Sequence, residues 1–246
     1  MAKVVIVTGA SGGLGGAIAV QFAVTGASVL VHYHSNRNDA EKVISKISNN
    51  GGVALAYQAD VRDFGEVRAM SEFVLAKWNA IDVLVNCAGG AAHNLGGKNQ
   101  LIVDLDEDMW DQVIDLNLKG PFLCMKAIAP QMIKQKSGHI INVGSGTGQK
   151  GRSGRSPYAA AKSGLLGLTK TAALELGEHN IKVNTVFPGR TSHERWTREG
   201  RKPGTTESVL GRVSGSPEEF ANFVVHLSTM ENVSGQTLNL DGRILF

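Results

Sequence analysis

The sequence has few of the features that mark several large classes of protein. Its two cysteines, Cys87 and Cys124, provide neither a metal-binding spacing nor a disulfide framework, and we expect them to be small buried apolar residues. Its apolar stretches fall short of the ~18 residues that a membrane-spanning helix requires, and no targeting segment is evident before the first strand-like run. Lysines and arginines are scattered, although the sequence pI is about 8.9. These absences argue against membrane and nucleic-acid partners and favour a cytoplasmic location.

The sequence does contain a regular alternation of short apolar runs and segments with helical spacing. The Val- and Ile-rich runs predict strands at Lys3 to Thr8, Ser28 to Tyr33, Val53 to Tyr57, Asp82 to Val85, His139 to Val143, Lys182 to Val186 and Thr237 to Leu240. The segments between them predict helices near 13–25, 38–49, 63–78, 107–135, 157–178 and 217–229. Continuous apolar strands that alternate with helices are typical of a parallel sheet covered on both faces. We therefore predict an α/β fold, a doubly wound parallel sheet of about seven strands, formed as a single domain over residues 1–246.

One long segment between the predicted elements shows no clear periodicity. It runs from Arg190 to Ser216. Segments of this length without secondary structure, when they occur inside a compact domain, are usually functional lids or loops. We expect residues 190–216 to cover the substrate.

A glycine-rich turn, Thr8 to Gly15, follows the first predicted strand and opens the first helix. Glycines allow the backbone to turn tightly and to approach a pyrophosphate, and the free N–H groups of a helix N-terminus attract phosphate oxygens. The spacing Gly9, Gly13, Gly15 differs from the G-x-G-x-x-G fingerprint of many dinucleotide sites. The position of the turn favours a dinucleotide site over a plain strand-to-helix turn.

Further motifs follow at intervals along the chain. They are Asp60-Val61, Asn86-Cys87-Ala88-Gly89, Asn117, Ser145, Tyr158-Ala159-Ala160-Ala161-Lys162 and Pro188-Gly189. With the glycine turn they resemble the short-chain dehydrogenase/reductase family over essentially the whole chain, with the greatest similarity to 3-oxoacyl-carrier-protein reductases and to small-alcohol or sugar dehydrogenases. The resemblance implies a Rossmann-like fold, a homotetramer, and hydride transfer between a nicotinamide dinucleotide and a small-molecule carbonyl or alcohol.

The resemblance also assigns residues to the cofactor. It implies contacts from Thr8, Gly9, Ser11, Gly13, Leu14 and Gly15 in the glycine turn, from Asp60 and Val61 near the adenine, from Asn86, Ala88 and Gly89 along the cleft, and from Tyr158, Lys162, Pro188, Gly189 and Thr191 near the nicotinamide. Taken singly, each residue has an ordinary structural explanation, such as an Asp that begins a turn. Their joint occurrence carries the prediction.

A second group of residues is predicted to carry the chemistry. In Ser156-Pro157 the Ser suits a helix cap and the Pro a first helical position, so Tyr158 lies in the first turn and Lys162 one turn further on the same face. The pKa of a free tyrosine is near 10, and we expect the lysine ammonium, the helix N-terminus and the nicotinamide ring together to lower it. We predict Tyr158 as the general acid/base. The resemblance implies that Ser145 hydrogen-bonds the substrate oxygen and that Asn117 supports a water relay behind Lys162.

The residues after the second strand bear on the choice between NADP(H) and NAD(H). Enzymes that prefer NAD usually place Asp or Glu there, whereas this sequence has Tyr33. The next residues, His34-Ser35-Asn36-Arg37, offer hydrogen-bond donors and one fixed positive charge, which suit a 2′-phosphate. We predict that the chain binds NADP(H) in preference to NAD(H). The alternative is that Arg37 is a solvated residue at a helix start.

The sequence constrains the substrate less. Lys150, Arg152 and Arg155 flank the predicted site and suggest an anionic substrate, with solubilising surface charge as the alternative. Docking of an acyl carrier protein stays open, because Lys136 matches one basic position of such reductases whereas His179 stands where arginine is expected.

Two other functional classes remain as alternatives. A dinucleotide sensor without catalytic activity is disfavoured, because such relatives commonly lose the Tyr or the Lys. An epimerase or dehydratase on an extended version of this fold usually has a separate C-terminal substrate domain, for which the sequence gives no sign.

Overall fold

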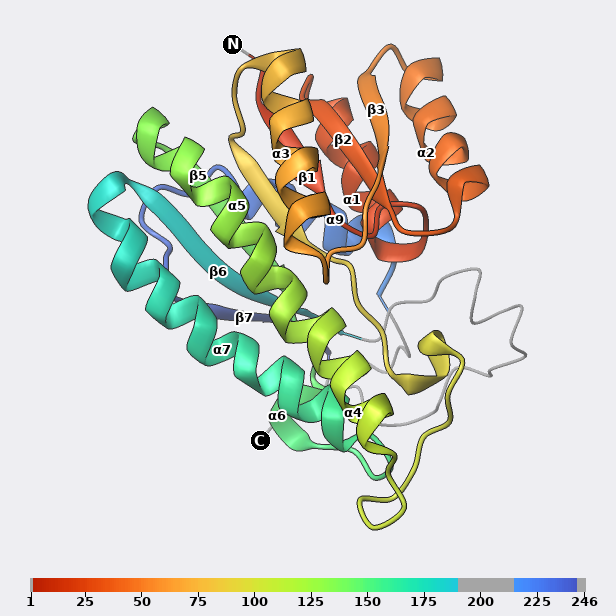
Figure 1. Cartoon of the computed structure of the whole chain (residues 1–246). Helices are drawn as coiled ribbons and strands as arrows, with labels where there is room; N and C mark the ends of the chain where they lie inside the picture. Colours follow the sequence, from red (N-terminus) through yellow and green to blue (C-terminus); the bar gives the residue numbers. More distant parts are fainter. Residues whose placement is uncertain (1, 190–214, 243–246) are drawn as a thin grey trace.

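The structure, a computed structural model, describes residues 2–189 and 215–242 and is built on one parallel sheet (Figure 1). The sheet has seven strands in the order β3-β2-β1-β4-β5-β6-β7, and every neighbouring pair is parallel. The strands are β1 (Val4–Val7), β2 (Ser28–Tyr33), β3 (Val53–Gln58), β4 (Val83–Asn86), β5 (Gly138–Val143), β6 (Ile181–Pro188) and β7 (Thr237–Leu240). The predicted strands are confirmed.

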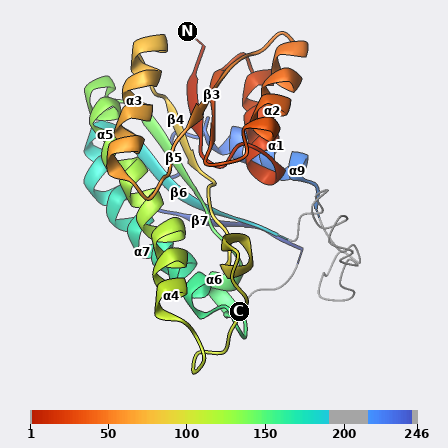
Figure 2. The same cartoon turned by 45° about the vertical axis from the view of Figure 1, so that its right-hand side comes forward.

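Two layers of helices sandwich the sheet (Figure 2). On one face lie α1 (Gly13–Val24), α2 (Arg37–Asn49) and α9 (Pro217–Leu227), and on the other lie α3 (Phe64–Trp78), α5 (Gly120–Gln135) and α7 (Ser156–Leu176). The shorter helical elements are η1 (Ala92–Leu95), α4 (Glu107–Ile114), η2 (Asp115–Lys119), α6 (Thr147–Lys150) and η3 (Gly177–His179). The doubly wound α/β fold is therefore confirmed. Within the described ranges, no helix has the length and apolar character that spanning a membrane would take.

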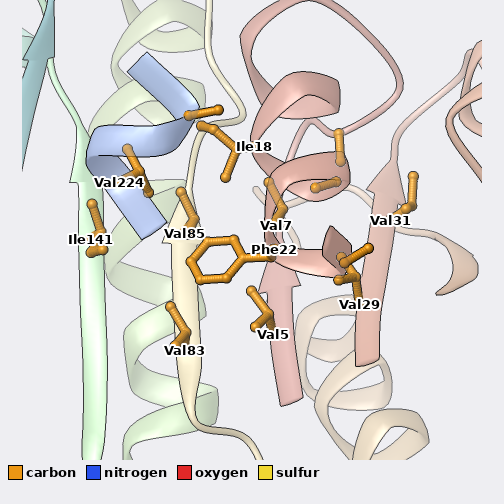
Figure 3. Packing of buried hydrophobic residues seen from close by; sticks show 14 of the residues in the cluster. Val5, Val7, Ile18, Phe22, Val29, Val31, Val83, Val85, Ile141 and Val224 are labelled. Atoms are coloured by element: carbon orange, nitrogen blue, oxygen red, sulfur yellow. The ribbon is translucent and has the colours of Figure 1, made fainter. Parts of the chain in front are cut away.

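The burial of the strands explains their sequences. Every residue of β1 and β4 is buried, because helices cover both faces of the sheet centre, whereas β3 at the sheet edge is partly exposed. In the layer between the sheet and α1, the ring of Phe22 lies against Val5 and Val7 of β1 and Val83 and Val85 of β4 (Figure 3). This packing fixes α1, and with it the glycine turn that precedes it, on the sheet.

The predicted helix at 107–135 differs from the structure in its middle. The helical backbone runs through without a break, but α4 and α5 are separated by η2, a π-helical turn over Asp115–Lys119. The spacing of apolar residues did not reveal this turn. Single π-turns inside α-helices occur frequently at functional sites, and this one contains the fully buried Asn117.

The strand order creates a switch point at the carboxyl ends of the strands, and we call this place the crevice. The chain builds β1, β2 and β3 towards one side and then returns to add β4 on the other side of β1. At such a switch point the loops leaving two neighbouring strands diverge, and ligands of doubly wound sheets bind there, at the carboxyl ends of the strands. The loops that follow β1 and β4 carry the glycine turn and the Asn86-to-Gly89 motif.

The substrate-covering segment predicted at 190–216 falls outside the described residues except for Gly215 and Ser216, and Thr191 falls outside them as well. Of the two that are described, Ser216 caps α9 through a hydrogen bond from Glu219 N to its Oγ, 3.0 Å long.

Candidate active site

The glycine turn after β1 packs closely against neighbouring backbone. Gly9 has φ +66°, and a Cβ on it would lie 2.8 Å from Cα of Ala88. A Cβ on Gly15 would lie 2.4 Å from the carbonyl oxygen of Gly9. Helix α1 begins at Gly13 with no side-chain cap on its N-terminus, so its first N–H groups are available to a ligand. The turn is therefore tightly folded, and it presents the free N–H groups that a phosphate group requires.

The other predicted residues of the turn have distinct positions. Ser11 and Leu14 are partly exposed, and Leu14 also packs against the core. Thr8 is buried, and its Oγ1 accepts hydrogen bonds from the backbone N–H groups of Cys87 and Ala88, both 3.0 Å long. Thr8 thus ties the loop after β4 to the glycine turn.

The residues that end β2 divide between the core and the surface. Tyr33 is buried among the apolar residues beneath α1 and α2, so its side chain is part of the core. His34 and Ser35 are exposed, and His34 Nε2 lies 3.8 Å from Oδ2 of Asp60.

The two residues that open α2 serve that helix. The side-chain oxygen of Asn36 caps α2 by accepting a hydrogen bond of 3.2 Å from Asp39 N. Arg37 lies one turn from Glu41, with 3.5 Å between Nε and Oε1, and its side chain is 74% exposed. In this geometry Arg37 is a solvated residue at a helix start, which is the alternative noted above. To bind a 2′-phosphate, its side chain would have to leave Glu41.

Asp60, which follows β3, is held by a residue that the sequence did not point to. Its two carboxylate oxygens accept hydrogen bonds from Arg62, with Nε to Oδ1 at 2.9 Å and Nη2 to Oδ2 at 2.7 Å. These hydrogen bonds from Arg62 lower the pKa of Asp60. Val61 is buried in the core beneath α3 and α5. Asp60 is therefore fixed and ionised at the rim of the crevice.

Tyr158 lies in the first turn of α7, which has Pro157 near its start. The Tyr158 side chain lies near that of Ser145, which follows β5, and this neighbour acts to lower the pKa of Tyr158. The expectation that Ser156 caps the helix is wrong: Ser156 is already the first helical residue, and its Oγ has no hydrogen-bond partner within the described chain. Helix α7 thus begins one residue earlier than expected, without a side-chain cap.

Lys162 is buried under Tyr158. Its Nζ lies 5.8 Å from the centroid of the Tyr158 ring and donates a hydrogen bond of 2.8 Å to the carbonyl oxygen of Val143. Burial lowers the pKa of Lys162 to about 8. The side chain therefore remains mainly protonated at neutral pH while its charge is only weakly stabilised.

The expected lowering of the pKa of Tyr158 counted the nicotinamide ring among its causes and stays a prediction, but the protein groups alone act in the opposite direction. Burial raises the pKa of Tyr158, and the neighbouring Ser145 side chain offsets only part of that effect. The Lys162 ammonium faces the ring and the Val143 carbonyl, so its charge does little for a phenolate. The Tyr158 hydroxyl consequently keeps its proton at neutral pH.

Asn117 stands behind Lys162, in the π-turn. Its amide donates to the carbonyl oxygens of Gly90 (2.8 Å) and Val113 (2.9 Å), and its Oδ1 accepts from Gly90 N (3.1 Å). A Cβ on Gly89 would lie 2.7 Å from Asn117 Oδ1 and 3.4 Å from Lys162 Nζ. The structure therefore brings Gly89, Asn117, Lys162, Tyr158 and Ser145 together at one place.

Asn86 and the Pro188-Gly189 pair complete the edge of the crevice. Asn86 ends β4 and donates through Nδ2 to Asn142 Oδ1, 2.9 Å away, beneath the crevice floor. Pro188 ends β6, and the N–H of Gly189 donates to the carbonyl oxygen of Leu240 at 2.7 Å. These residues lie at the carboxyl ends of the strands, as the sequence predicts.

Lys136 and His179, the two positions considered for carrier-protein docking, lie elsewhere. Lys136 ends α5 just before β5, and His179 ends η3 just before β6, so both sit at the amino ends of strands whose carboxyl ends carry the site. The six residues of β5 alone separate the two edges by roughly 20 Å. In one chain, neither residue is near Tyr158.

Three residues near the predicted site were missed from the sequence: Arg62, His32 and Thr169. Arg62 holds Asp60, two residues before it, whereas His32 contacts Gly9 and Ala59, which are distant in the sequence. His32 gave one signal that we did not use, namely a polar residue at a buried position in the apolar strand Ser28–Tyr33. Thr169 of α7 also escaped notice, and it accepts a hydrogen bond from Asn142 Nδ2 at 2.9 Å that links α7 to the floor of the crevice.

A doubly wound sheet with a glycine cradle at its switch point and a Ser-Tyr-Lys set beside it is the arrangement of a nicotinamide-dependent dehydrogenase. Residues 3–203 match the model of the family described as short chain dehydrogenase, and the chain belongs to this family. It is therefore an NAD(P)-dependent oxidoreductase.

Individual relatives cover almost the whole chain. The chain is 41% identical over 244 residues to a 3-oxoacyl-[acyl-carrier-protein] reductase of Synechocystis sp., a match covering 98% of this chain and 96% of the relative. It is 39% identical over 247 residues to the 3-oxoacyl-[acyl-carrier-protein] reductase FabG of Staphylococcus aureus, with 98% of each chain covered. Among solved structures, the acetoin dehydrogenase of Enterobacter cloacae superposes with a TM-score of 0.87 at 32% identity, over 98% of this chain and 95% of that chain.

Proposed function

We propose that the chain interconverts a carbonyl and a secondary alcohol with Tyr158 as the general acid/base and NADP(H) as the preferred cofactor. The observation that carries the proposal is that Tyr158, Ser145 and the buried ammonium of Lys162 lie together, with Lys162 Nζ 5.8 Å from the centroid of the Tyr158 ring. Two neighbouring hydroxyl groups can hold a substrate oxygen from two sides, and one of the two can pass it a proton.

The residues around the crevice fit a dinucleotide. The uncapped start of α1 and the close backbone approach at Gly9 and Gly15 suit the pyrophosphate, and the fixed carboxylate of Asp60 suits the adenine side. Gly89 places no side chain against Lys162 Nζ and Asn117 Oδ1, which suits a close approach of the nicotinamide ribose. When bound, the nicotinamide supplies or accepts the hydride.

The chain's own residues then move the proton. In the reductive direction the Tyr158 hydroxyl donates its proton to the substrate oxygen while Ser145 donates a hydrogen bond to the same atom. Lys162 and Asn117 line the route by which Tyr158 regains a proton. Reduction requires the protonated hydroxyl, and burial, which raises the pKa of Tyr158, favours that form.

The preference for NADP(H) depends on the start of α2. Among the residues from Tyr33 to Arg37, only Arg37 carries a fixed positive charge, and none is acidic. A 2′-phosphate would exchange the exposed contact of Arg37 with Glu41 for a charge-assisted hydrogen bond.

Replacing Arg37 by Ala tests this preference. We expect kcat/KM with NADPH to fall about tenfold, because a hydrogen bond to a charged group is worth about 1.5–3 kcal/mol and this one is exposed. The kcat/KM with NADH should change less than twofold, because NADH has no 2′-phosphate for Arg37 to contact. Arg68→Ala is the matched control, because Arg68 pairs with Glu72 at the same spacing and distance, 3.5 Å, away from the crevice. An unchanged NADPH-to-NADH ratio in Arg37→Ala would remove Arg37 from the cofactor site.

A 3-oxoacyl group on an acyl carrier protein is our more specific candidate for the substrate. It is favoured by the two near-full-length relatives of that name. Lys150, Arg152 and Arg155 stand just before Tyr158 in the chain, where an anionic substrate would approach. Oxidation of NADPH and NADH should be followed with 3-oxoacyl thioesters, acetoin, keto acids, sugars and simple ketones. Turnover confined to neutral ketones would exclude the anionic substrate, and no turnover with any of them would overturn the proposed function.

We further propose a homotetramer that forms through α5 and α7, and we keep the cytoplasmic location as a prediction. Phe122 on α5 and Leu174 on α7 are 44% and 85% exposed in the single chain, which suits burial between copies. Light scattering coupled to size-exclusion chromatography measures the mass of the assembly. A monomer at micromolar concentration would overturn the tetramer.

A further inference from the structure

We infer that His32 is a positioning residue of the cofactor site. Its imidazole bridges the backbone of Gly9 to the backbone of Ala59. The bridge sets the spacing between the glycine turn, where the phosphates would bind, and the turn that carries Asp60, where the adenine would bind. The inference rests on the proposed placement of the dinucleotide. It concerns a side chain that does not touch the cofactor.

The contacts of His32 join three strand ends. His32 lies near the end of β2 with 1% of its surface exposed. The N–H of Gly9, just after β1, donates to His32 Nδ1 at 3.0 Å, and His32 Nε2 lies 2.9 Å from the carbonyl oxygen of Ala59, just after β3. The imidazole therefore joins Gly9, the first glycine of the Thr8-to-Gly15 turn, to Ala59, the residue before Asp60.

The bridge requires one particular tautomer. A backbone N–H can only donate, so Nδ1 must present its lone pair to Gly9. The single ring proton then sits on Nε2 and points to the Ala59 carbonyl. Burial lowers the pKa of His32 to about 4, so the neutral ring that this pattern needs persists at neutral pH.

The position of Gly9 controls the phosphate cradle. A Cβ on Gly15 would lie only 2.4 Å from the carbonyl oxygen of Gly9, so Gly9 and the start of α1 are in direct backbone contact. On its other side Gly9 packs against Ala88. Without an acceptor at Nδ1, the partly buried N–H of Gly9 would lack its partner and the turn would shift to find another. A shift there moves the N–H groups that face the phosphates.

The alternative is that His32 is simply a well-packed core residue. Three variants separate the two explanations. His32→Phe keeps the ring and removes both hydrogen bonds, and His32→Asn keeps one acceptor and one donor. His139→Phe is the matched control, because His139 is also buried in a strand, β5, but stands at the amino end of the sheet.

The main measurement is the dissociation constant of NADPH, by fluorescence titration, alongside the thermal midpoint and the steady-state constants. For His32→Phe we expect the Kd and the KM of the cofactor to rise about tenfold, the effect of losing one hydrogen bond that positions the Gly9 turn. The kcat at saturating cofactor should stay within about twofold of the wild-type value. His32→Asn should recover most of the affinity. His139→Phe should leave Kd unchanged whatever its effect on the thermal midpoint.

Two results would overturn the inference. One is a His32→Phe protein with lowered thermal midpoint and unchanged Kd, which is the behaviour of a core residue. The other needs no variant: nitrogen NMR of the wild-type imidazole must show an unprotonated Nδ1, and a proton at that atom excludes the bridge. If wild-type protein bound neither NADPH nor NADH, the proposed function would fail while the NMR result on the bridge still stood.

Discussion

Replacing Tyr158 by Phe should lower kcat in the reductive direction by about 10² to 10⁴, the range typical for loss of a positioned general acid. The variant removes one oxygen atom and keeps the ring over Lys162, so the packing of α7 is preserved. Because that oxygen is the only part of Tyr158 assigned to proton transfer, the Kd of the cofactor should change little. Single-turnover reduction at saturating NADPH measures the step directly, and fluorescence titration measures Kd.

Tyr57→Phe provides the control for this experiment. Tyr57 is a partly buried tyrosine of β3, with its ring 5.0 Å from that of Phe73, and β3 stands at the far side of the sheet from β5 and β6. The Tyr57→Phe variant loses the same hydroxyl oxygen and should keep the wild-type turnover rate. Full activity of Tyr158→Phe would exclude Tyr158 as the acid, and an equal loss in Tyr57→Phe would show that the effect is on folding.

The structure gives Tyr158 a different starting point from the one that the sequence suggested. Sequence reasoning emphasised how a tyrosine could become a base, and so expected a lowered pKa. In the folded chain burial dominates and raises the pKa, which makes Tyr158 an acid that holds its proton until the substrate oxygen takes it. Oxidation of an alcohol requires the opposite form, the phenolate.

The fold was predictable because its determinants are local. The burial of β1 and β4 on both faces requires continuous apolar runs, and these are visible in the sequence without knowledge of neighbours. The same holds for Tyr158 and Lys162, whose common helix face follows from a spacing of four residues.

What could not be predicted depends on which distant groups the fold brings into contact. The bridge from Gly9 through His32 to Ala59 joins three strand ends, and its distances depend on the register of β1, β2 and β3. The far position of Lys136 has the same cause, because a residue before β5 and one after it stand at opposite edges of the sheet. The π-turn at Asn117 adds a local departure that apolar periodicity cannot reveal, since the helix continues through it.

The second large effect concerns the glycine cradle. Gly15→Ala should raise the Kd of NADPH by about 100-fold and lower the free energy of unfolding by about 1–3 kcal/mol, as overpacking does. The added Cβ would lie 2.4 Å from the carbonyl oxygen of Gly9 and 2.9 Å from its carbonyl carbon. Both are backbone atoms, so the clash can be relieved only by moving the turn or the start of α1. Fluorescence titration and chemical denaturation measure the two quantities.

Gly12→Ala makes this prediction decisive, because it adds the same methyl group to the same turn. A Cβ on Gly12 would have no atom within 4 Å, and the backbone there is extended, with φ 167°, so any residue can adopt it. Gly12→Ala should therefore unfold like the wild-type chain and lose less NADPH affinity than Gly15→Ala. The two variants differ in how closely the new methyl group approaches the backbone. An equal loss of NADPH binding in both would therefore show that the contact between residue 15 and Gly9 is not the cause. Wild-type binding by Gly15→Ala would show that the contact between Gly9 and α1 does not shape the phosphate site, and it would remove the basis on which the position of Gly9, and hence His32, governs cofactor affinity.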